Sequence, residues 1–333
     1  WETLAALPYF NAASANLGYG WRCDETGGFQ RGLIDDHELF VRWNQFACFS
    51  PTYRLHNCGD PGMDYRPWAK PAEYRDAILA AMRLRRGLLP YIYTAAHANA
   101  TGGPCLCRPL YQDYPDCEEA YGCPQQYCFG PDLIAAPFTS PADSTVNLAR
   151  QVVWLPEGQW YDFFTGDLYA GGRFHALYGG LSDIPVFARA GAAIPLLHEG
   201  RQVLRVFPGE GASDVYDDAG EGMAWRNDAA FCLLRATQTC EHGEGRICLE
   251  QAGGMLNPVG DWLVELAGEP EPLGTLTAGG VLNYACEPRP PSFSRPDFVA
   301  LLQRFSILGH TLRPLIGKPN VDFDPAVQPH SET

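Results

Sequence analysis

The stretch ELFVRWNQFACFSPTYRLHN, residues 38–57, joins a helix pattern to a strand pattern. Its first part, residues 39–49, carries apolar side chains at helical spacing. Asp35 and Glu38 have the three-residue spacing of a capping box, which places the start of this helix. Residues 51–55 then read as a short strand. The stretch therefore predicts a helix that leads directly into a strand.

The flanking segments repeat this order. Residues 1–15 predict a helix that ends at two nearby glycines, and residues 19–23 predict a short buried strand. A glycine pair at 27–28 predicts a turn, and residues 71–99 predict one long helix. Alternating strands and helices are typical of a parallel α/β unit.

After residue 102 the pattern changes to short alternating strands separated by Gly, Pro, Asp and Asn. This pattern predicts an all-β sandwich up to about residue 199 and a second β segment over residues 201–266. From residue 287 a Pro-rich stretch leads to a predicted helix at 297–308 and a polar tail.

Composition limits the classes of function. The 333 residues are 46% hydrophobic and 12% aromatic, so the chain can bury a core. The apolar runs are all shorter than the roughly 20 residues that cross a bilayer, so no membrane partner is expected. The formal net charge of −15 repels phosphate backbones, so nucleic acid is not the expected partner, and a neutral or cationic ligand is favoured. A sugar is compatible with this charge.

Twelve cysteines are scattered along the chain without a zinc-type spacing. Reduced, buried thiols are the preferred interpretation, and disulfides and zinc stay open as alternatives. The chain begins at Trp1 without a methionine or a signal sequence, which indicates a fragment or a processed product. The cellular compartment is not readable from such a start, and the cytoplasm is the expectation.

Six motifs follow one another along the chain: CDETGGF (23–29), ELFVRWNQFACFSPTYRLHN (38–57), RRGLLPYIYTAAHANATGGPCLCRPL (85–110), VVWLPEGQWYDFFTG (152–166), IPVFARAGAAIPL (184–196) and VYDDAG (215–220). In this order they resemble the motifs of glycoside hydrolase family 31, the α-glucosidase and α-xylosidase family. The first resembles the family's D-I-G-G-F turn, and the second its R-W and R-x-H segment.

The resemblance implies an α/β part followed by all-β parts. Residues 1–101 would be the last two strand-helix units of a (β/α)8 TIM barrel, residues 102–199 a proximal β-sandwich, and residues 200–287 a distal β-domain. Residues 288–333 stay unassigned. In such barrels the chemistry lies at the C-terminal ends of the strands, which here are residues 24–29 and 54–56.

The resemblance also implies a retaining mechanism, in which two carboxylates lie about 5 Å apart around the scissile bond. The family nucleophile lies in a W-x-D-M-N-E-like motif, which this sequence lacks. The family acid/base Asp lies in a G-D-N segment, expected shortly before Trp1. The chain is therefore expected to be a C-terminal fragment without either catalytic carboxylate, and inactive by itself.

Four residues inherit substrate-binding roles from the resemblance. Asp24 would help to hold the sugar in the −1 subsite, Phe29 would form part of its apolar wall, and His56 would donate a hydrogen bond to a sugar hydroxyl. Arg54 would pair with a carboxylate of the pocket. Without the family context, Asp24 is as readily a turn residue beside the glycine pair.

The Asp of the family's first motif can be aligned with either of two residues in this sequence. Counting forward from Trp21 matches Asp24 to the family Asp and makes Thr26 an insertion. Counting back from Gly27 through one residue matches Glu25 instead. Asp24 is the preferred match.

The functional hypothesis is a fragment of a retaining α-glycoside hydrolase that acts on terminal α-glucosyl or α-xylosyl units. A transglycosylase of the same family and a non-catalytic carbohydrate-binding remnant are the alternatives. The expected partner is an α-linked oligosaccharide or α-glycoside, with no cofactor and no metal. Assembly into a homo-oligomer is compatible with the sequence.

Overall fold

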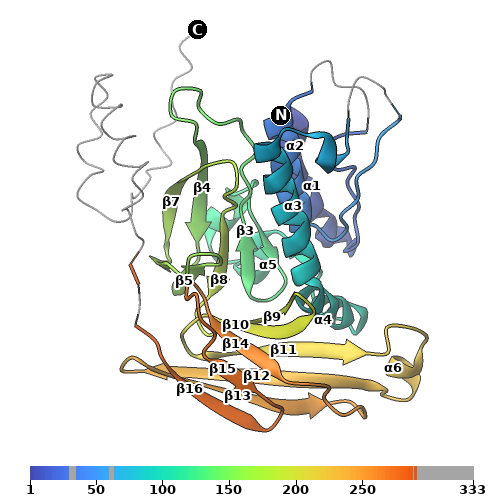
Figure 1. The fold of residues 1–333 in the computed structure, drawn as a ribbon, viewed down its shortest axis with the longest axis vertical. Helices are drawn as coiled ribbons and strands as arrows, with labels where there is room; N and C mark the ends of the chain where they lie inside the picture. The colour runs from blue at the N-terminus through green and yellow to red at the C-terminus, as the bar shows by residue number, and fades with distance from the viewer. Residues whose placement is uncertain (30–34, 60–63, 288, 291–333) are drawn as a thin grey trace.

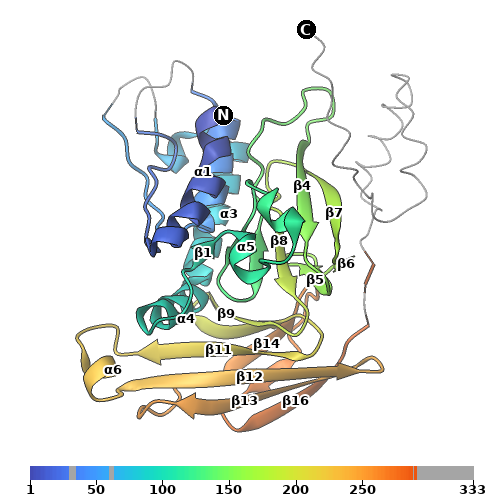
Figure 2. The ribbon, with the colours of Figure 1, turned by 180° about the vertical axis from the view of Figure 1, so that it is seen from behind.

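The computed structural model describes residues 1–29, 35–59, 64–287 and 289–290. A helical part stands beside a first group of β-strands, and the long strands of a second group cross beneath both (Figures 1 and 2). The helical part consists of α1 (Glu2–Ala13), the 3-10 turn η1 (Ser14–Leu17), α2 (His37–Cys48), η2 (Pro67–Ala69), α3 (Ala72–Gly87) and α4 (Leu89–Ala100).

The first helix forms as predicted, and the strand after it does not. The helical run ends at Gly18, whose φ of 70° lies in the left-handed region that glycine adopts without strain. The prediction of a buried strand at 19–23 is wrong, because Tyr19 is 66% exposed and Trp21 is 46% exposed. In the part of the chain that the structure describes, extended pairing at this point is limited to isolated parallel bridges, at Cys23 and Thr26.

Helix α2 begins one residue later than the capping box predicts. Asp36 is the N-cap, and its Oδ1 accepts a hydrogen bond of 2.9 Å from the backbone N–H of Leu39. Trp1 Nε1 donates to the other oxygen of Asp36 at 2.8 Å. Asp35 instead pairs with Lys70, at 2.6 Å, so it is not available as the cap. Glu38 accepts from the backbone N–H of Ala142 at 3.0 Å, which ties the start of α2 to the β part.

The predicted single helix over 71–99 is two helices. α3 ends at Gly87, and α4 begins at Leu89. Pro90 occupies the first turn of α4, where its missing N–H costs nothing, whereas inside a continuous helix it would remove a hydrogen bond and clash with the preceding turn. The proline therefore sets the break.

The first β group contains two sheets that share a core. The larger sheet has the strand order β1-β2-β3-β8-β5-β6, and β4 pairs with β7 in a separate antiparallel sheet. The bounds are β1 (Cys107–Arg108), β2 (Tyr127–Phe129), β3 (Leu133–Ala135), β4 (Ala149–Leu155), β5 (Gln159–Asp162), β6 (Leu168–Ala170), β7 (Arg173–Gly179) and β8 (Val186–Arg189). Two short helices, α5 (Leu110–Asp113) and η3 (Glu118–Tyr121), lie between β1 and β2. Ile134, Trp154 and Phe187 are among the buried residues that join the two sheets.

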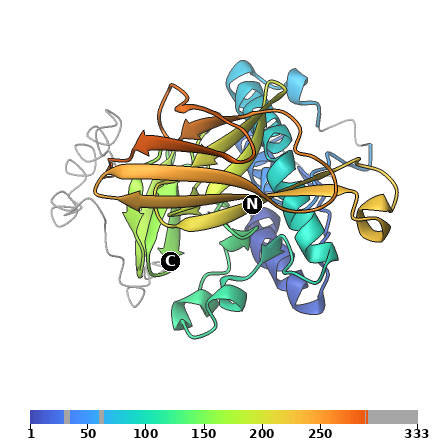
Figure 3. The ribbon, with the colours of Figure 1, turned by 90° about the horizontal axis from the view of Figure 1, so that it is seen from below.

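The second β group also contains two sheets, and Figure 3 shows its long strands extending across the molecule. One sheet has the order β15-β14-β10-β9, with β10 and β14 parallel, and the other has the order β11-β12-β13-β16. The bounds are β9 (Ala193–His198), β10 (Arg201–Val206), β11 (Gly211–Asp218), β12 (Phe231–Glu241), β13 (Glu244–Gly253), β14 (Trp262–Leu266), β15 (Gly274–Leu276) and β16 (Gly280–Ala285), with α6 (Ala224–Asn227) between β11 and β12. The predicted boundary at 199/200 falls in the turn of the β9–β10 hairpin.

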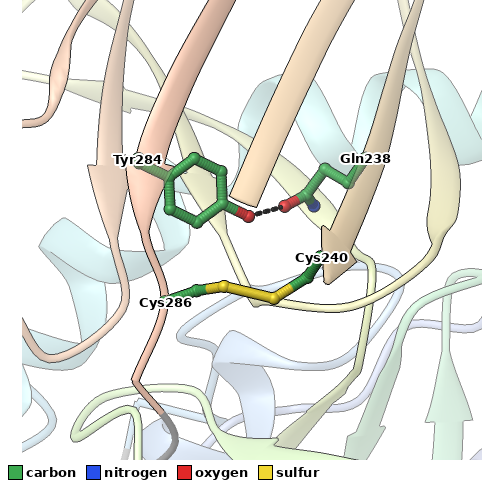
Figure 4. Close-up of a disulfide and its surroundings, with 4 residues drawn as sticks. All are labelled: Gln238, Cys240, Tyr284 and Cys286. Carbon is green, nitrogen blue, oxygen red and sulfur yellow. Dashed lines mark hydrogen bonds between the residues drawn. A yellow bond between two sulfur atoms is a disulfide. The ribbon is translucent and has the colours of Figure 1, made fainter. Parts of the chain in front are cut away.

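One pair of cysteines departs from the preferred interpretation of reduced thiols. Cys240, on β12, forms a disulfide with Cys286, which follows β16 (Figure 4). The hydroxyl of Tyr284 donates a hydrogen bond of 2.7 Å to Gln238 Oε1 beside it.

Ten other cysteines are free thiols, and half of them are buried. Burial raises the pKa of the Cys48 thiol to about 12, so this thiol stays protonated and packs as an apolar group.

The predicted fold class is confirmed as a mixed α/β part followed by β-sheet parts. The division into domains at 101, 199 and 287 stays a prediction. The predicted helix at 297–308 lies outside the described residues. Within the described ranges, no helix is both long enough and apolar enough to cross a membrane.

Candidate sugar-binding site

The two predicted strand ends lie side by side. Parallel bridges join Cys23 to Thr52 and Thr26 to Leu55. The backbone N–H of Thr26 donates to the carbonyl oxygen of Arg54 at 3.0 Å. Parallel bridges bring the C-terminal ends of both segments to the same side, where the chemistry of α/β barrels is located. The segments at 24–29 and 54–56 are therefore neighbours, as the sequence predicts.

The glycine pair makes the turn between Glu25 and Phe29. Gly27 and Gly28 have φ values of 94° and 87°, and the N–H of Gly28 donates to the carbonyl oxygen of Glu25 at 2.7 Å. A Cβ atom on Gly27 would lie 2.5 Å from the ring of Tyr65, so glycine is required there by space as well as by conformation. The turn therefore fixes where the side chains on either side of it lie.

Glu25 joins Arg54 and His56 into one cluster. Glu25 Oε1 lies 2.6 Å from Arg54 Nη2 and 3.0 Å from His56 Nδ1. Arg54 Nη2 also lies 3.4 Å from His56 Nδ1. The three side chains are 30%, 50% and 45% exposed, so the cluster can be reached by a ligand. A partly exposed ion pair of this kind adds little to stability, but it holds the arginine and the histidine in one orientation.

Phe29 completes the cluster with an apolar surface. Its ring centroid lies 5.1 Å from that of His56, and 42% of the residue is exposed. The N–H of Cys58 donates to the carbonyl oxygen of Phe29 at 3.0 Å, which holds the end of one segment to the other. A ring beside charged donors suits a ligand with one apolar face and a polar rim, and a sugar is such a ligand.

Asp24 lies apart from this cluster. It is only 6% exposed, and its carboxylate accepts a hydrogen bond from Asn11 Nδ2 at 2.9 Å and lies 3.4 Å from Arg22 Nε. Burial raises the pKa of Asp24, and the nearby Arg22 and Asn11 oppose that shift. The same amide nitrogen of Asn11 lies 3.3 Å from Ser50 Oγ, so Asp24 belongs to a buried polar contact between α1 and the end of α2.

The structure thus brings three of the four predicted residues together and adds Glu25. Phe29, Arg54 and His56 meet, whereas the polar partners of Asp24 are on α1 and in its own segment. The signal for Glu25 was present in the sequence, because counting back one residue from Gly27 selects it. Within the described residues, no group of three or more His, Cys, Asp or Glu side chains is arranged to hold a metal ion.

Comparison with known proteins gives the class and the family. A model described as the TIM-barrel domain of glycosyl hydrolases family 31 matches residues 1–95, and one described as the C-terminal domain of that family matches residues 103–194. The molecule therefore contains part of a barrel-type glycoside hydrolase followed by its β-sheet domains. The chain belongs to glycosyl hydrolase family 31.

Two curated relatives cover a similar share of the chain. An α-xylosidase of Saccharolobus solfataricus is 38% identical over an alignment of 238 residues that covers 66% of this chain and 31% of the relative. Alpha-glucosidase 2 of Bacillus thermoamyloliquefaciens is 30% identical over 67% of this chain and 28% of the relative. The chain thus spans less than a third of the length of either protein.

Solved structures agree with the family. A dextranase of this family from Flavobacterium johnsoniae, complexed with glucose, is 27% identical with a TM-score of 0.71, over 80% of this chain and 34% of that chain. A mutant of the same enzyme was solved with isomaltotriose. An α-xylosidase from Xanthomonas citri is similar in fold, with a TM-score of 0.67.

Proposed function

We propose that this chain supplies one side of the −1 sugar subsite of a retaining α-glycoside hydrolase, which acts on terminal α-glucosyl or α-xylosyl units. The observation that carries the proposal is the cluster in which Glu25 holds Arg54 and His56 beside the ring of Phe29. The names of the relatives favour this substrate class, since they include an α-xylosidase and an α-glucosidase.

The cluster has the groups that such a subsite needs. With Nδ1–H of His56 facing the Glu25 carboxylate, Nε2 is the ring nitrogen left for a sugar hydroxyl: it donates when the ring is doubly protonated and accepts from the hydroxyl when the ring is neutral. Arg54 supplies further donors, and its charge is balanced by Glu25 at 2.6 Å, so the arginine is held before the sugar arrives. Donors fixed in advance contribute more to binding and to transition-state stabilisation than donors that must first be ordered.

The bond-breaking step requires two further carboxylates. A retaining enzyme needs a nucleophile and an acid/base about 5 Å apart, and the cluster supplies only one carboxylate, already paired with Arg54 and His56. Neither Asp24, which is buried, nor Glu25 is assigned a catalytic role in this proposal. The other barrel segments would supply both catalytic groups, and the 333-residue chain alone would not turn over substrate.

A chimera tests this proposal. The part of the Saccharolobus solfataricus α-xylosidase that aligns with this chain would be replaced by the matching part of this chain. We expect the chimera to hydrolyse p-nitrophenyl α-xyloside or α-glucoside, and His56→Ala in the chimera to lower kcat/KM roughly tenfold or more, because a hydrogen bond to the sugar is lost. The 333-residue chain is the matched control and is expected to be inactive. Robust turnover by the chain alone, or full activity of the His56→Ala chimera, would overturn the proposal.

Transfer to an acceptor sugar is the second candidate reaction. A 1,6-alpha-glucosyltransferase of Sporosarcina globispora is 28% identical over 80% of this chain, a longer match than that of either hydrolase. Supplying the chimera with a donor glycoside and an excess of glucose would distinguish the reactions. Free monosaccharide as the main product supports hydrolysis, and a new disaccharide supports transfer. If neither reaction occurs but sugar still binds, the result supports the alternative of a non-catalytic carbohydrate-binding remnant.

A further inference from the structure

A pair of stacked tyrosines lies on the surface outside the candidate subsite. Tyr111, on α5, and Tyr121, at the end of η3, have ring centroids 4.9 Å apart and planes inclined by only 8°. Tyr121 is 59% exposed, and Tyr111 packs on the core cluster that contains Trp154. The segment that carries the pair projects beside α1 in Figure 3. One ring of the pair therefore faces solvent and the other anchors it to the core.

Both rings are fixed at their hydroxyl groups. Asn16 Nδ2 donates to the hydroxyl of Tyr111 at 2.7 Å, and Gln112 Nε2 donates to Asn16 Oδ1 at 2.8 Å. The hydroxyl of Tyr121 donates to the carbonyl oxygen of Pro115 at 3.1 Å. A ligand that stacks on Tyr121 would therefore lose little side-chain freedom, because the ring is already held in place.

The surroundings of the ring indicate a neutral, hydroxyl-rich ligand. Exposed polar residues flank the pair in sequence or contact it, namely Asn16, Gln112, Glu118 and Glu119. The net charge of −15 disfavours anionic ligands. A pyranose fits these features, since its C–H face can stack on an aromatic ring while its hydroxyls reach amides and carboxylates.

We propose that the open face of Tyr121, supported by Tyr111, is a second saccharide-binding site for the glucosyl chain of a neutral α-glucan. The ligand class rests on the proposed function, whereas the site shares no residue with the Glu25, Arg54 and His56 cluster. Such a site would hold a polymeric substrate near the enzyme without taking part in bond cleavage.

Native electrophoresis of the 333-residue chain in gels with and without dextran tests the site. We expect dextran to retard the wild-type chain, and Tyr121→Ala to weaken this binding roughly tenfold, as expected for loss of a stacking contact. Tyr121→Phe keeps the ring and is expected to retain most of the retardation. Tyr178→Ala is the matched control, because Tyr178 is 40% exposed on β7. Thermal melting of each variant verifies that it is folded.

The outcomes separate the second site from the proposed subsite. Retardation that survives His56→Ala but is lost in Tyr121→Ala supports the second site. Equal retardation of wild type and Tyr121→Ala, an equal loss in Tyr178→Ala, or no retardation of the wild type overturns it. Self-association that depends on Tyr121, seen by sedimentation velocity, would also overturn it by showing that a second copy covers the ring. None of these results changes the activity of the chimera, which tests the subsite separately.

Discussion

At the scale of single residues, the direction of a side chain separates Glu25 from Asp24. Successive side chains of extended backbone point to opposite sides, and these two carboxylates follow that rule. Asp24 points inward to Asn11, and Glu25 points outward to Arg54. The same alternation places Arg54 and His56 on one side, because they are two residues apart. Counting along the sequence from Trp21 or from Gly27 left both acids as candidates. The contact with Arg54 favours Glu25 as the acid of the proposed subsite.

The carboxyl group of Asp162 leads to a prediction of how stability depends on pH. Its Oδ1 accepts from the N–H groups of Phe164 and Thr165 at 2.9 and 2.8 Å, in the turn after β5. Burial raises the pKa of Asp162 to about 6, against the lowering effect of those bonds. The folded chain therefore binds this proton more tightly than the unfolded chain, whose Asp has a pKa of about 3.9. Stability contributed by this group is lost as the pH rises from about 4 to 6.

Asp162→Asn keeps the oxygen acceptor and removes the charge. We expect the free energy of unfolding of the variant, relative to wild type, to rise by up to about 3 kcal/mol between pH 4 and pH 7. Urea denaturation of both proteins at pH 4, 5, 6 and 7 measures this difference. The other titrating groups are the same in both proteins, so their contributions cancel. A difference that stays constant with pH would show that Asp162 does not titrate in this range.

At the scale of secondary-structure elements, the first two helices were predictable, whereas the break between α3 and α4 and the strands of the helical part were not. The local sequence locates α1 and α2 to within a few residues, because an α-helix makes its backbone hydrogen bonds within its own segment. A strand depends on partners that local sequence does not contain, so the predicted strands at 19–23 and 51–55 reduce to isolated bridges. The alternating strands after residue 102 find antiparallel partners within the chain, and they form.

Arg85 connects α3 to the segment that carries the candidate site. Its guanidinium donates to the carbonyl oxygens of Cys48 at 3.0 Å and Pro51 at 2.8 Å, and also to that of Ser50. These carbonyls lie between the end of α2 and Arg54. The interaction therefore fixes the backbone that leads into the site.

Arg85→Met leaves these carbonyl groups without their donor. We expect the free energy of unfolding to fall by about 2–4 kcal/mol, the cost of leaving partly buried acceptors unpaired. Arg83→Met, on the exposed side of the same helix, is the control and is expected to change stability by less than about 0.5 kcal/mol. Urea unfolding of both variants measures the effect, and equal stability of the two would contradict this role for Arg85.

At the scale of the whole molecule, the barrel part carries several exposed apolar side chains. Five aromatic or aliphatic residues of α1 and the segment after it are about half exposed or more: Tyr9, Phe10, Leu17, Tyr19 and Trp21. We expect another polypeptide to pack on this segment, because large exposed apolar side chains that form one patch are typical of interaction surfaces. The chain matches less than a third of either curated relative, so a complete sugar pocket is proposed only for the assembled barrel.

The most direct test of the proposed subsite therefore uses the chimera with the α-xylosidase. Glu25→Gln and Asp24→Asn are each made in the chimera, and kcat/KM of the two variants is compared. We predict a loss of roughly ten- to a hundredfold for Glu25→Gln, because Arg54 and His56 lose the charge that holds them. Asp24→Asn keeps an acceptor for Asn11 and is predicted to lose much less. A greater loss for Asp24→Asn, with Glu25→Gln close to wild type, would contradict the account and make Asp24 the acid that serves the sugar.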